Sequence, residues 1–203
     1  MLVAIPISAA VVAGCATAKQ DQPSAAAAAA APTPSAAPTT GSVASSSTTA
    51  DPNEDYEAKA GDFVNVHDMT AVRGFFISNE LGHLDEALKV VNDPNGGTYP
   101  VGTIIQLVPQ EAMVKRKAGF APDGGDWEFF QLTVTPTGTE IKQRGTGEIK
   151  NLFNQSCGAC HMKADIKFDF VCEKSHGCDP LPMPDTFFKN LQDHDPRPRQ
   201  SHS

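Results

Sequence analysis

The chain is poor in basic residues and has no long apolar run. Its 203 residues include 16 Lys and Arg against 24 Asp and Glu, which gives a formal net charge of −8. This charge argues against a nucleic-acid partner, because binding to nucleic acid requires a cationic surface. The apolar segment from Met1 to Ala13 is too short to span a membrane. We interpret it as a segment that is removed during export.

The end of this apolar run carries an export pattern. Val12-Ala13-Gly14-Cys15 resembles the end of a bacterial lipoprotein signal, where the cysteine is acylated. We therefore expect residues 1–14 to be a signal peptide and Cys15 to attach the protein to a membrane through lipid. An ordinary secretory signal is the alternative. Either reading places the protein in the periplasm or cell envelope.

Large apolar side chains are almost missing from residues 15–55, where Val43 is the exception. The segment is rich in Ala, Ser, Thr and Pro, and its prolines interrupt any helix that the alanines would favour. Without apolar residues to bury it cannot form a core, so we expect a disordered linker. Residues 193–203 are polar and are expected to be a loose tail. One domain of ordinary size, residues 56–192, remains.

Cysteine is scarce, and most of the five cysteines lie close together near the C-terminus. Cys157-Gly158-Ala159-Cys160-His161 has the spacing of covalent c-type haem attachment. Each thiol adds to one haem vinyl group, so both sulfurs must face one edge of the porphyrin. The next histidine then becomes the axial ligand of the iron. The sequence therefore predicts one covalent haem c on Cys157 and Cys160, with His161 as the metal ligand.

Two other readings of this motif compete with haem. A four-ligand zinc site would need two further ligands, which Cys172, His176 and Cys178 could supply. A redox dithiol should follow a strand and open a βαβ unit, and the sequence has no such pattern. Once lipid and haem have taken three cysteines, Cys172 and Cys178 are left, and in an oxidising compartment we expect them to form a disulfide.

The region before the motif has mainly strand signals: β-branched and aromatic runs bounded by Pro and Gly. The predicted strands are residues 102–108, 111–120, 127–135 and 139–144. Residues 84–92 are ambiguous between helix and strand, and residues 149–155 predict a short helix that leads to Cys157. We expect an α+β fold, mainly antiparallel β, in which a small sheet and a few short helices carry one C-terminal haem.

Several segments together resemble the cytochrome P460 family, which includes the β-sheet cytochromes c′-β. They are Tyr99-Pro100-Val101-Gly102-Thr103, Met113-Val114-Lys115-Arg116, Gly125-Asp126-Trp127-Glu128-Phe129-Phe130 and the haem motif at 157–161. The resemblance covers roughly residues 81–182. By contrast, the chain lacks the four long apolar-periodic segments of the helical cytochromes c′.

The resemblance implies a small antiparallel sheet, often in a homodimer, that carries one c-type haem. It implies that His161 is the proximal ligand and that the iron is five-coordinate. Members of the family oxidise hydroxylamine or bind nitric oxide. The expected partners are therefore a small nitrogen ligand and a redox partner that the sequence does not identify.

One departure from the family limits the expected chemistry. Members that oxidise hydroxylamine have a lysine, on the strand after the Gly-Thr pair, that is cross-linked to the haem. Here Leu107 or Gln106 occupies that place, and the nearest lysines are Lys115 and Lys117. Neither Leu nor Gln can make that bond. We therefore expect Leu107 to belong to an apolar cap over the haem, and hydroxylamine oxidation to be weak or absent.

Other side chains have candidate roles. Lys115, in a basic run, is a candidate partner for a haem propionate, because charge-assisted pairs with carboxylates are strong. Met183 is the best candidate for a sixth iron ligand. With that ligand, the protein would be a six-coordinate electron-transfer cytochrome c of the periplasm. A zinc-stapled module without haem is the third functional hypothesis.

Lipid attachment through Cys15 can be tested in the host cell. Cys15→Ser should move the protein from the membrane fraction to the soluble fraction, because serine cannot accept the lipid. Immunoblotting of the two fractions measures this change. Unchanged retention in the membrane fraction would contradict the prediction.

Overall fold

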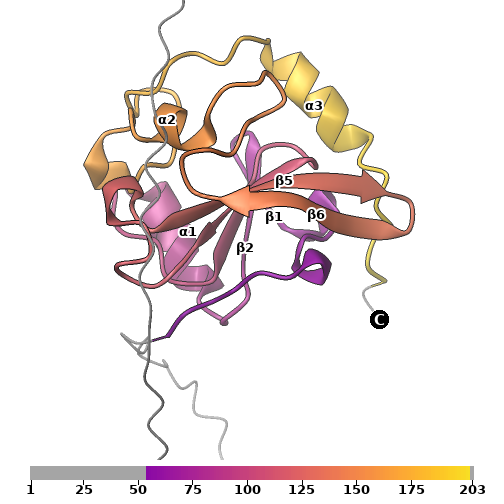
Figure 1. Ribbon diagram of the computed structural model, residues 1–203, viewed down its shortest axis with the longest axis horizontal. Coiled ribbons are helices and arrows are strands. Elements are labelled where there is room, and N and C mark those ends of the chain that lie inside the picture. The colour runs from indigo at the N-terminus through magenta and orange to yellow at the C-terminus, as the bar shows by residue number, and fades with distance from the viewer. Residues whose placement is uncertain (1–53, 202–203) are drawn as a thin grey trace, which may run out of the picture. The chain divides into compact units, whose positions relative to one another are not determined.

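The computed structural model describes residues 54–201, and the predicted signal peptide, Cys15 and nearly all of the linker lie outside them. Six antiparallel strands form one sheet in sequence order (Figure 1). The strands are β1 Thr70–Val72, β2 Phe75–Asn79, β3 Thr103–Gln106, β4 Glu111–Lys115, β5 Trp127–Thr135 and β6 Gly138–Gly145. The α+β class with a mainly antiparallel sheet is thereby confirmed.

In the described part of the chain, three short α-helices and four 3-10 turns accompany the sheet. The helices are α1 Leu84–Asn92, α2 Cys157–His161 and α3 Asp185–Asp193. The turns are η1 Ala60–Asp62, η2 Val66–Asp68, η3 Pro122–Gly124 and η4 Ile166–Phe168. The chain from α2 to α3 arches over one side of the sheet (Figure 1). Within residues 54–201, no helix has the length and apolarity to cross a membrane.

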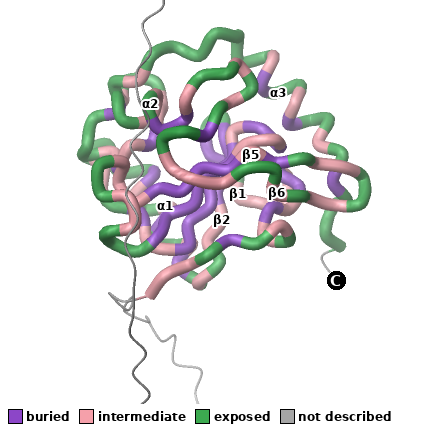
Figure 2. Tube along the Cα trace, viewed as in Figure 1, coloured by how far each residue is buried: buried purple, intermediate pink, exposed green. Residues whose placement is uncertain are grey.

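The central strands separate two apolar clusters because successive side chains point to opposite faces of a strand. Ile105, Met113 and Phe129 are register neighbours and belong to the cluster on the first face. This cluster also contains Ala87 and Val91 of α1 and residues of the haem-motif segment. On the second face, Ile104 and Val114 pack with the segment that precedes β1. Burial is concentrated on these central strands (Figure 2).

The ambiguous segment 84–92 is the helix α1. Asp85 and Glu86 lie in its first turn and Lys89 lies in its last, which complements the helix dipole. Ala87 and Val91 are buried against the first face of the sheet. Helix propensity thus prevails over the strand reading that the two valines suggested.

Two segments differ from the expectation. Residues 149–155 form a turn rather than a helix, because the Asn151 carboxamide oxygen accepts the backbone N–H groups of Phe153 and Gln155. The strand predicted over 111–120 ends at Lys115, after which the backbone turns towards η3. The hairpin of β1 and β2 has no counterpart among the predicted strands.

The C-terminal tail is packed against the domain rather than loose, at least as far as Gln200. Arg197 and Asp195 form an ion pair whose side chains are 2% and 1% exposed. Arg197 also donates to the Phe63 carbonyl oxygen, 2.9 Å away, and the Asn65 carboxamide donates to the Arg197 carbonyl. Composition alone did not reveal that the tail is packed. The tail is polar, and the buried Asp195–Arg197 pair attaches it to the domain.

Removing one partner of this buried pair should be costly. Arg197→Ala leaves the Asp195 carboxylate buried without its cation, so the free energy of unfolding should fall by about 3–5 kcal/mol. Urea unfolding of the full chain, followed by Trp127 fluorescence, measures the change. Lys189→Ala is the matched control, because Lys189 forms an exposed pair with Asp193 on α3. The control should change stability by about 0.5 kcal/mol or less. Equal effects would refute the proposed role of the buried pair.

Candidate haem attachment site

The helix α2 carries the whole haem motif in little more than one turn. The Ser156 hydroxyl caps it by accepting the backbone N–H of Ala159 at 3.1 Å, and the Cys157 N–H bonds the Ile149 carbonyl at 2.8 Å. In a helix, residues three apart lie on the same face, so Cys157 and Cys160 are neighbours. Both are free thiols; Cys157 is buried and Cys160 is partly exposed. This arrangement suits attachment of one planar group along one edge.

The motif needs glycine at its first inner position. A Cβ on Gly158 would lie 2.7 Å from the Cα of Gly147. The loop before the motif therefore contacts the backbone of α2 directly, with no space for a side chain. Ala159, at the second inner position, is exposed.

The electrostatic surroundings keep both thiols protonated. Burial raises the pKa of Cys157 to about 12, and the neighbouring Glu111 and Cys160 add to the shift. Burial, together with Asp179, also raises the pKa of Cys160. Redox-active dithiols require the opposite shift, since their nucleophile is a thiolate with a lowered pKa. The redox-dithiol reading therefore has no electrostatic support.

The His161 ring is oriented by a backbone carbonyl. Its Nδ1 lies 2.8 Å from the Phe170 carbonyl oxygen, which can only accept, so Nδ1 carries the proton. Burial lowers the pKa of His161, which favours the neutral ring. The lone pair is then on Nε2, the arrangement of metal-binding histidines whose other nitrogen donates to a carbonyl. The ring also packs on Phe129, with centroids 5.1 Å apart.

Lys115 has a different partner from the haem propionate expected for it. Its ammonium lies 2.6 and 2.8 Å from the two carboxylate oxygens of Asp169 and 2.6 Å from the Gly125 carbonyl oxygen. These contacts occupy the three donors of an ammonium group. Both side chains of the pair are buried, so Lys115 is part of the protein interior.

The disulfide between Cys172 and Cys178 is confirmed, with the two Cα atoms 5.7 Å apart. His176, in the same loop, stacks on Phe168 at 3.6 Å and bonds the Val171 carbonyl oxygen through Nδ1. The three side chains that a zinc site would recruit are thus engaged elsewhere. Within residues 54–201, no group of three or more His, Cys, Asp or Glu side chains has an arrangement that could hold a metal ion.

A cavity of about 1150 Å³ lies beside the first face of the sheet. Its walls come from the β1–β2 hairpin, the end of α1, the disulfide loop and α3. The apolar wall includes Val72, Phe75, Val91 and Leu107, so Leu107 lines a cavity as expected of a cap residue. The motif side chains themselves are not among the lining residues. Of the motif, Cys157 belongs to the apolar cluster that also contains Val72, Phe75 and Val91 and against which Leu107 packs.

The rim of the cavity is charged, in contrast to this apolar wall. Arg73 bonds both carboxylate oxygens of Glu173, at 2.6 and 2.5 Å, and so joins the β1–β2 hairpin to the disulfide loop. It also donates to the Asn92 side chain and to the Val91 carbonyl. All three guanidinium nitrogens are therefore bound to protein acceptors.

Gln106, the alternative to Leu107 as the position of the family's cross-linking lysine, lies on the other face of the sheet. The Gln106 side chain is fully buried and donates to the backbone carbonyls of Pro109 and Glu111. Lys117 is half exposed and lies 3.9 Å from the Asp55 carboxylate. Leu107 is thus the residue of this group that faces the cavity.

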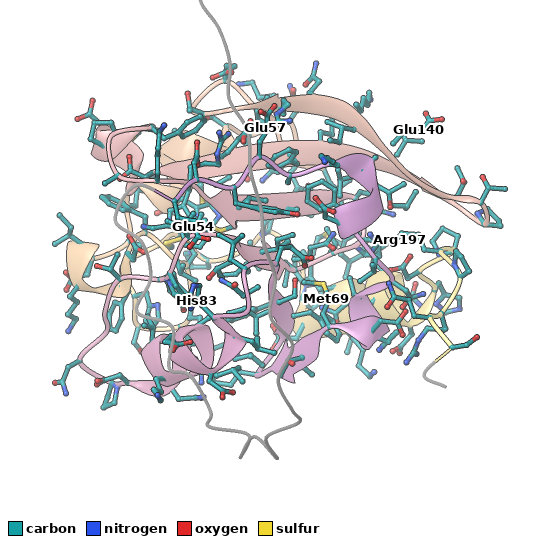
Figure 3. All side chains as sticks on the ribbon, turned by 90° about the horizontal axis from the view of Figure 1, so that it is seen from below. Glu54, Glu57, Met69, His83, Glu140 and Arg197 are labelled. Carbon is teal, nitrogen blue, oxygen red and sulfur yellow. A yellow bond between two sulfur atoms is a disulfide. The ribbon has the colours of Figure 1, made fainter. Side chains whose placement is uncertain are left out.

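The methionines occupy different environments. Met113 is buried within the apolar cluster, and Met162 is exposed. Met183 is 38% exposed and lies between Leu181 and Asp185, which both line the cavity. It is therefore two residues in sequence from the cavity wall, as Met69 is from Ala71. The His83 side chain is buried, and its Nε2 lies 3.7 Å from a carboxylate oxygen of Glu54 (Figure 3).

The sequence did not predict that the Phe170 carbonyl orients His161, nor the role of Asp169, which precedes Phe170. Asp169 lies between Phe168 and Phe170, and a carboxylate between two aromatic residues is a signal of a buried polar partner. The lysine at an inward-facing position of β4, Lys115, is the complementary signal.

Comparisons with family models, with curated proteins and with solved structures found no match to this chain. The resemblance to the cytochrome P460 family therefore stays a prediction.

Alkylation can verify the division of the cysteines. In protein made without haem attachment, Cys157 and Cys160 should react with iodoacetamide after denaturation without reductant, whereas Cys172 and Cys178 should react only after reduction. Peptide mass spectrometry distinguishes the four positions. Labelling of Cys172 before reduction would disprove the disulfide, and a mass loss linking Cys157 to Cys160 would point to a redox dithiol.

Proposed function

We propose that this protein is an exported mono-haem c-type cytochrome of the P460 kind, held in the cell envelope by lipid on Cys15, that binds nitric oxide. The observation that carries the proposal is the orientation of His161. Its Nδ1 proton is committed to the Phe170 carbonyl, and Nε2 is left as a ligand next to two unpaired thiols.

The residues present fit a covalent haem. Cys157 and Cys160 would hold it through thioether bonds, and His161 would ligate the iron through Nε2. The neighbouring cavity of about 1150 Å³ has the volume for a large group, and Cys157 shares an apolar cluster with part of its wall. When bound, haem supplies an iron atom with a coordination site that a small ligand can occupy.

The chain's own residues favour an uncharged ligand on the cavity side. Val72, Phe75 and Leu107 form an apolar wall and their side chains offer no hydrogen-bond donor. Arg73, at the rim, has each of its three guanidinium nitrogens hydrogen-bonded within the protein, to Glu173, Asn92 and the Val91 carbonyl. The cationic side chains Lys174 and Lys189 also line the cavity, and they pair with Asp185 and Asp193. An anionic ligand would find no hydrogen-bond partner on the apolar wall, so neutral nitric oxide is preferred there.

The same residues disfavour rapid hydroxylamine oxidation. Leu107 faces the cavity in the place where the family's cross-linking lysine is expected, and Gln106 lies on the opposite face. Lys115, the lysine on the first face of β4, is neutralised by Asp169. Enzymatic turnover of hydroxylamine is therefore not part of the proposed function.

Electron transfer through a six-coordinate haem is the second candidate. The chain on both sides of Met183 lines the cavity, and a methionine there could close the vacant coordination site. The closed site would leave only electron transfer, with a redox partner yet to be identified.

Optical spectroscopy separates the two functions. We expect high-spin spectra in both oxidation states and rapid formation of a ferrous nitrosyl complex, because in the proposed function no protein side chain would take the sixth position. A low-spin ferrous spectrum that becomes high-spin in Met183→Ala would assign the protein to electron transfer instead.

Acid–acetone extraction provides the control for haem attachment. Haem should stay on the polypeptide of the wild-type protein and be extracted from a Cys157→Ser/Cys160→Ser variant. Complete extraction from the wild type would contradict covalent attachment and with it the proposed function. Fast hydroxylamine oxidation would show that Leu107 does not prevent that reaction.

A further inference from the structure

The carbonyl that orients His161 belongs to a backbone turn of unusual conformation. Asp169 and Phe170 have φ angles of +51° and +61°, in the left-handed region that side-chain-bearing residues rarely adopt. Two consecutive residues of this kind persist only where their surroundings hold them. The position of the Phe170 carbonyl therefore depends on what fixes this turn.

Asp169 supplies the fixation through both its side chain and its backbone. Its carboxylate accepts two bonds from the Lys115 ammonium, at 2.8 and 2.6 Å, and one from the Tyr99 backbone N–H at 2.9 Å. Its carbonyl oxygen accepts the Trp127 indole N–H at 2.7 Å. The Lys115 and Asp169 side chains are 6% and 8% exposed, so water competes little for these bonds.

A third segment closes on the same turn. Gly125 has a φ of +67°, and a Cβ there would lie 2.4 Å from the Phe170 ring and 2.9 Å from an Asp169 carboxylate oxygen. The Gly125 carbonyl accepts the third bond of the Lys115 ammonium, at 2.6 Å. The strands β4 and β5 and the loop between them thus hold Asp169 and Phe170 from several directions.

We propose that Lys115 and Asp169 are positioning residues that set the strength of the iron–histidine bond. They fix the Phe170 carbonyl, and the carbonyl fixes the Nδ1 proton of His161. The inference rests on the proposed function, because it requires His161 to ligate iron.

The expected effect follows from ligand basicity. A well-placed acceptor on Nδ1–H makes the imidazole a stronger donor through Nε2. If the ion pair is lost, the turn relaxes and the carbonyl moves, so the hydrogen bond to Nδ1 weakens. His161 then donates less to the iron, which stabilises the ferric state less and raises the reduction potential.

The experiment uses the haem-loaded full chain with Asp169→Asn, which keeps the shape of the side chain but removes its charge. The iron–histidine stretching band of the ferrous protein, measured by resonance Raman, should shift to lower wavenumber. The reduction potential should rise, and this second readout applies to a six-coordinate iron as well. The double variant Lys115→Met/Asp169→Asn should give the same shifts as Asp169→Asn alone, because both changes break one interaction.

The matched control is a buried ion pair on the other face of the sheet. Glu128 bonds Arg116 at 2.5 Å and Arg144 at 2.6 Å, and it has no contact with the 169–170 turn. Glu128→Gln should lower stability without moving the stretching band or the potential. Equal shifts in both variants, or none in Asp169→Asn, would overturn the inference.

A second variant covers the case in which Asp169→Asn does not fold. Lys115→Gln keeps the Asp169 carboxylate and its bond from Tyr99. It should shift the stretching band and the reduction potential in the same directions as Asp169→Asn.

Acid–acetone extraction of the wild type is carried out alongside. If the wild type holds no covalent haem, the proposed function and this inference both fail. If it holds haem and the variants leave band and potential unchanged, only the inference fails.

Discussion

The ion pair between Lys115 and Asp169 connects the sheet to the segment that carries the haem motif. Burying two charges is expensive, and their attraction seldom returns more than that cost. Burial accordingly raises the pKa of Asp169, with Lys115 opposing the shift. The pair is therefore better explained by the geometry it imposes than by stability. It holds the left-handed turn at Asp169 and Phe170, and the Phe170 carbonyl of this turn orients His161.

The pair can form only because the strand register places Lys115 on the correct face. Along β4, Met113 and Lys115 face the haem-motif segment, while Val114 faces the opposite cluster. A slip of one residue would exchange these environments. Such alternation is a local property, so the sequence predicted four of the strands and the antiparallel class. The disulfide was equally accessible, because the number of cysteines pointed to it. The haem assignment rests on the motif spacing and stays a prediction.

The parts that escaped prediction depend on contacts between distant residues. The Asn151 side chain replaces the expected helix before the motif by a turn, and Arg197 secures a tail that composition describes as loose. Asp169 joins residues 54 positions apart in the chain through its bond with Lys115. Neither periodicity nor propensity reports such pairs. A single buried charge in an apolar setting is the one local sign that they exist.

The direct contact between α2 and the loop before it has a consequence for how this motif can vary. The spacing pattern has two inner positions, and pattern matching treats them as equivalent. In this fold they are not, since the backbone of Gly147 fills the space beside Gly158 while Ala159 faces solvent. Other side chains can therefore replace Ala159. At Gly158 any side chain would clash with the Gly147 backbone. The motif has one neutral site rather than two.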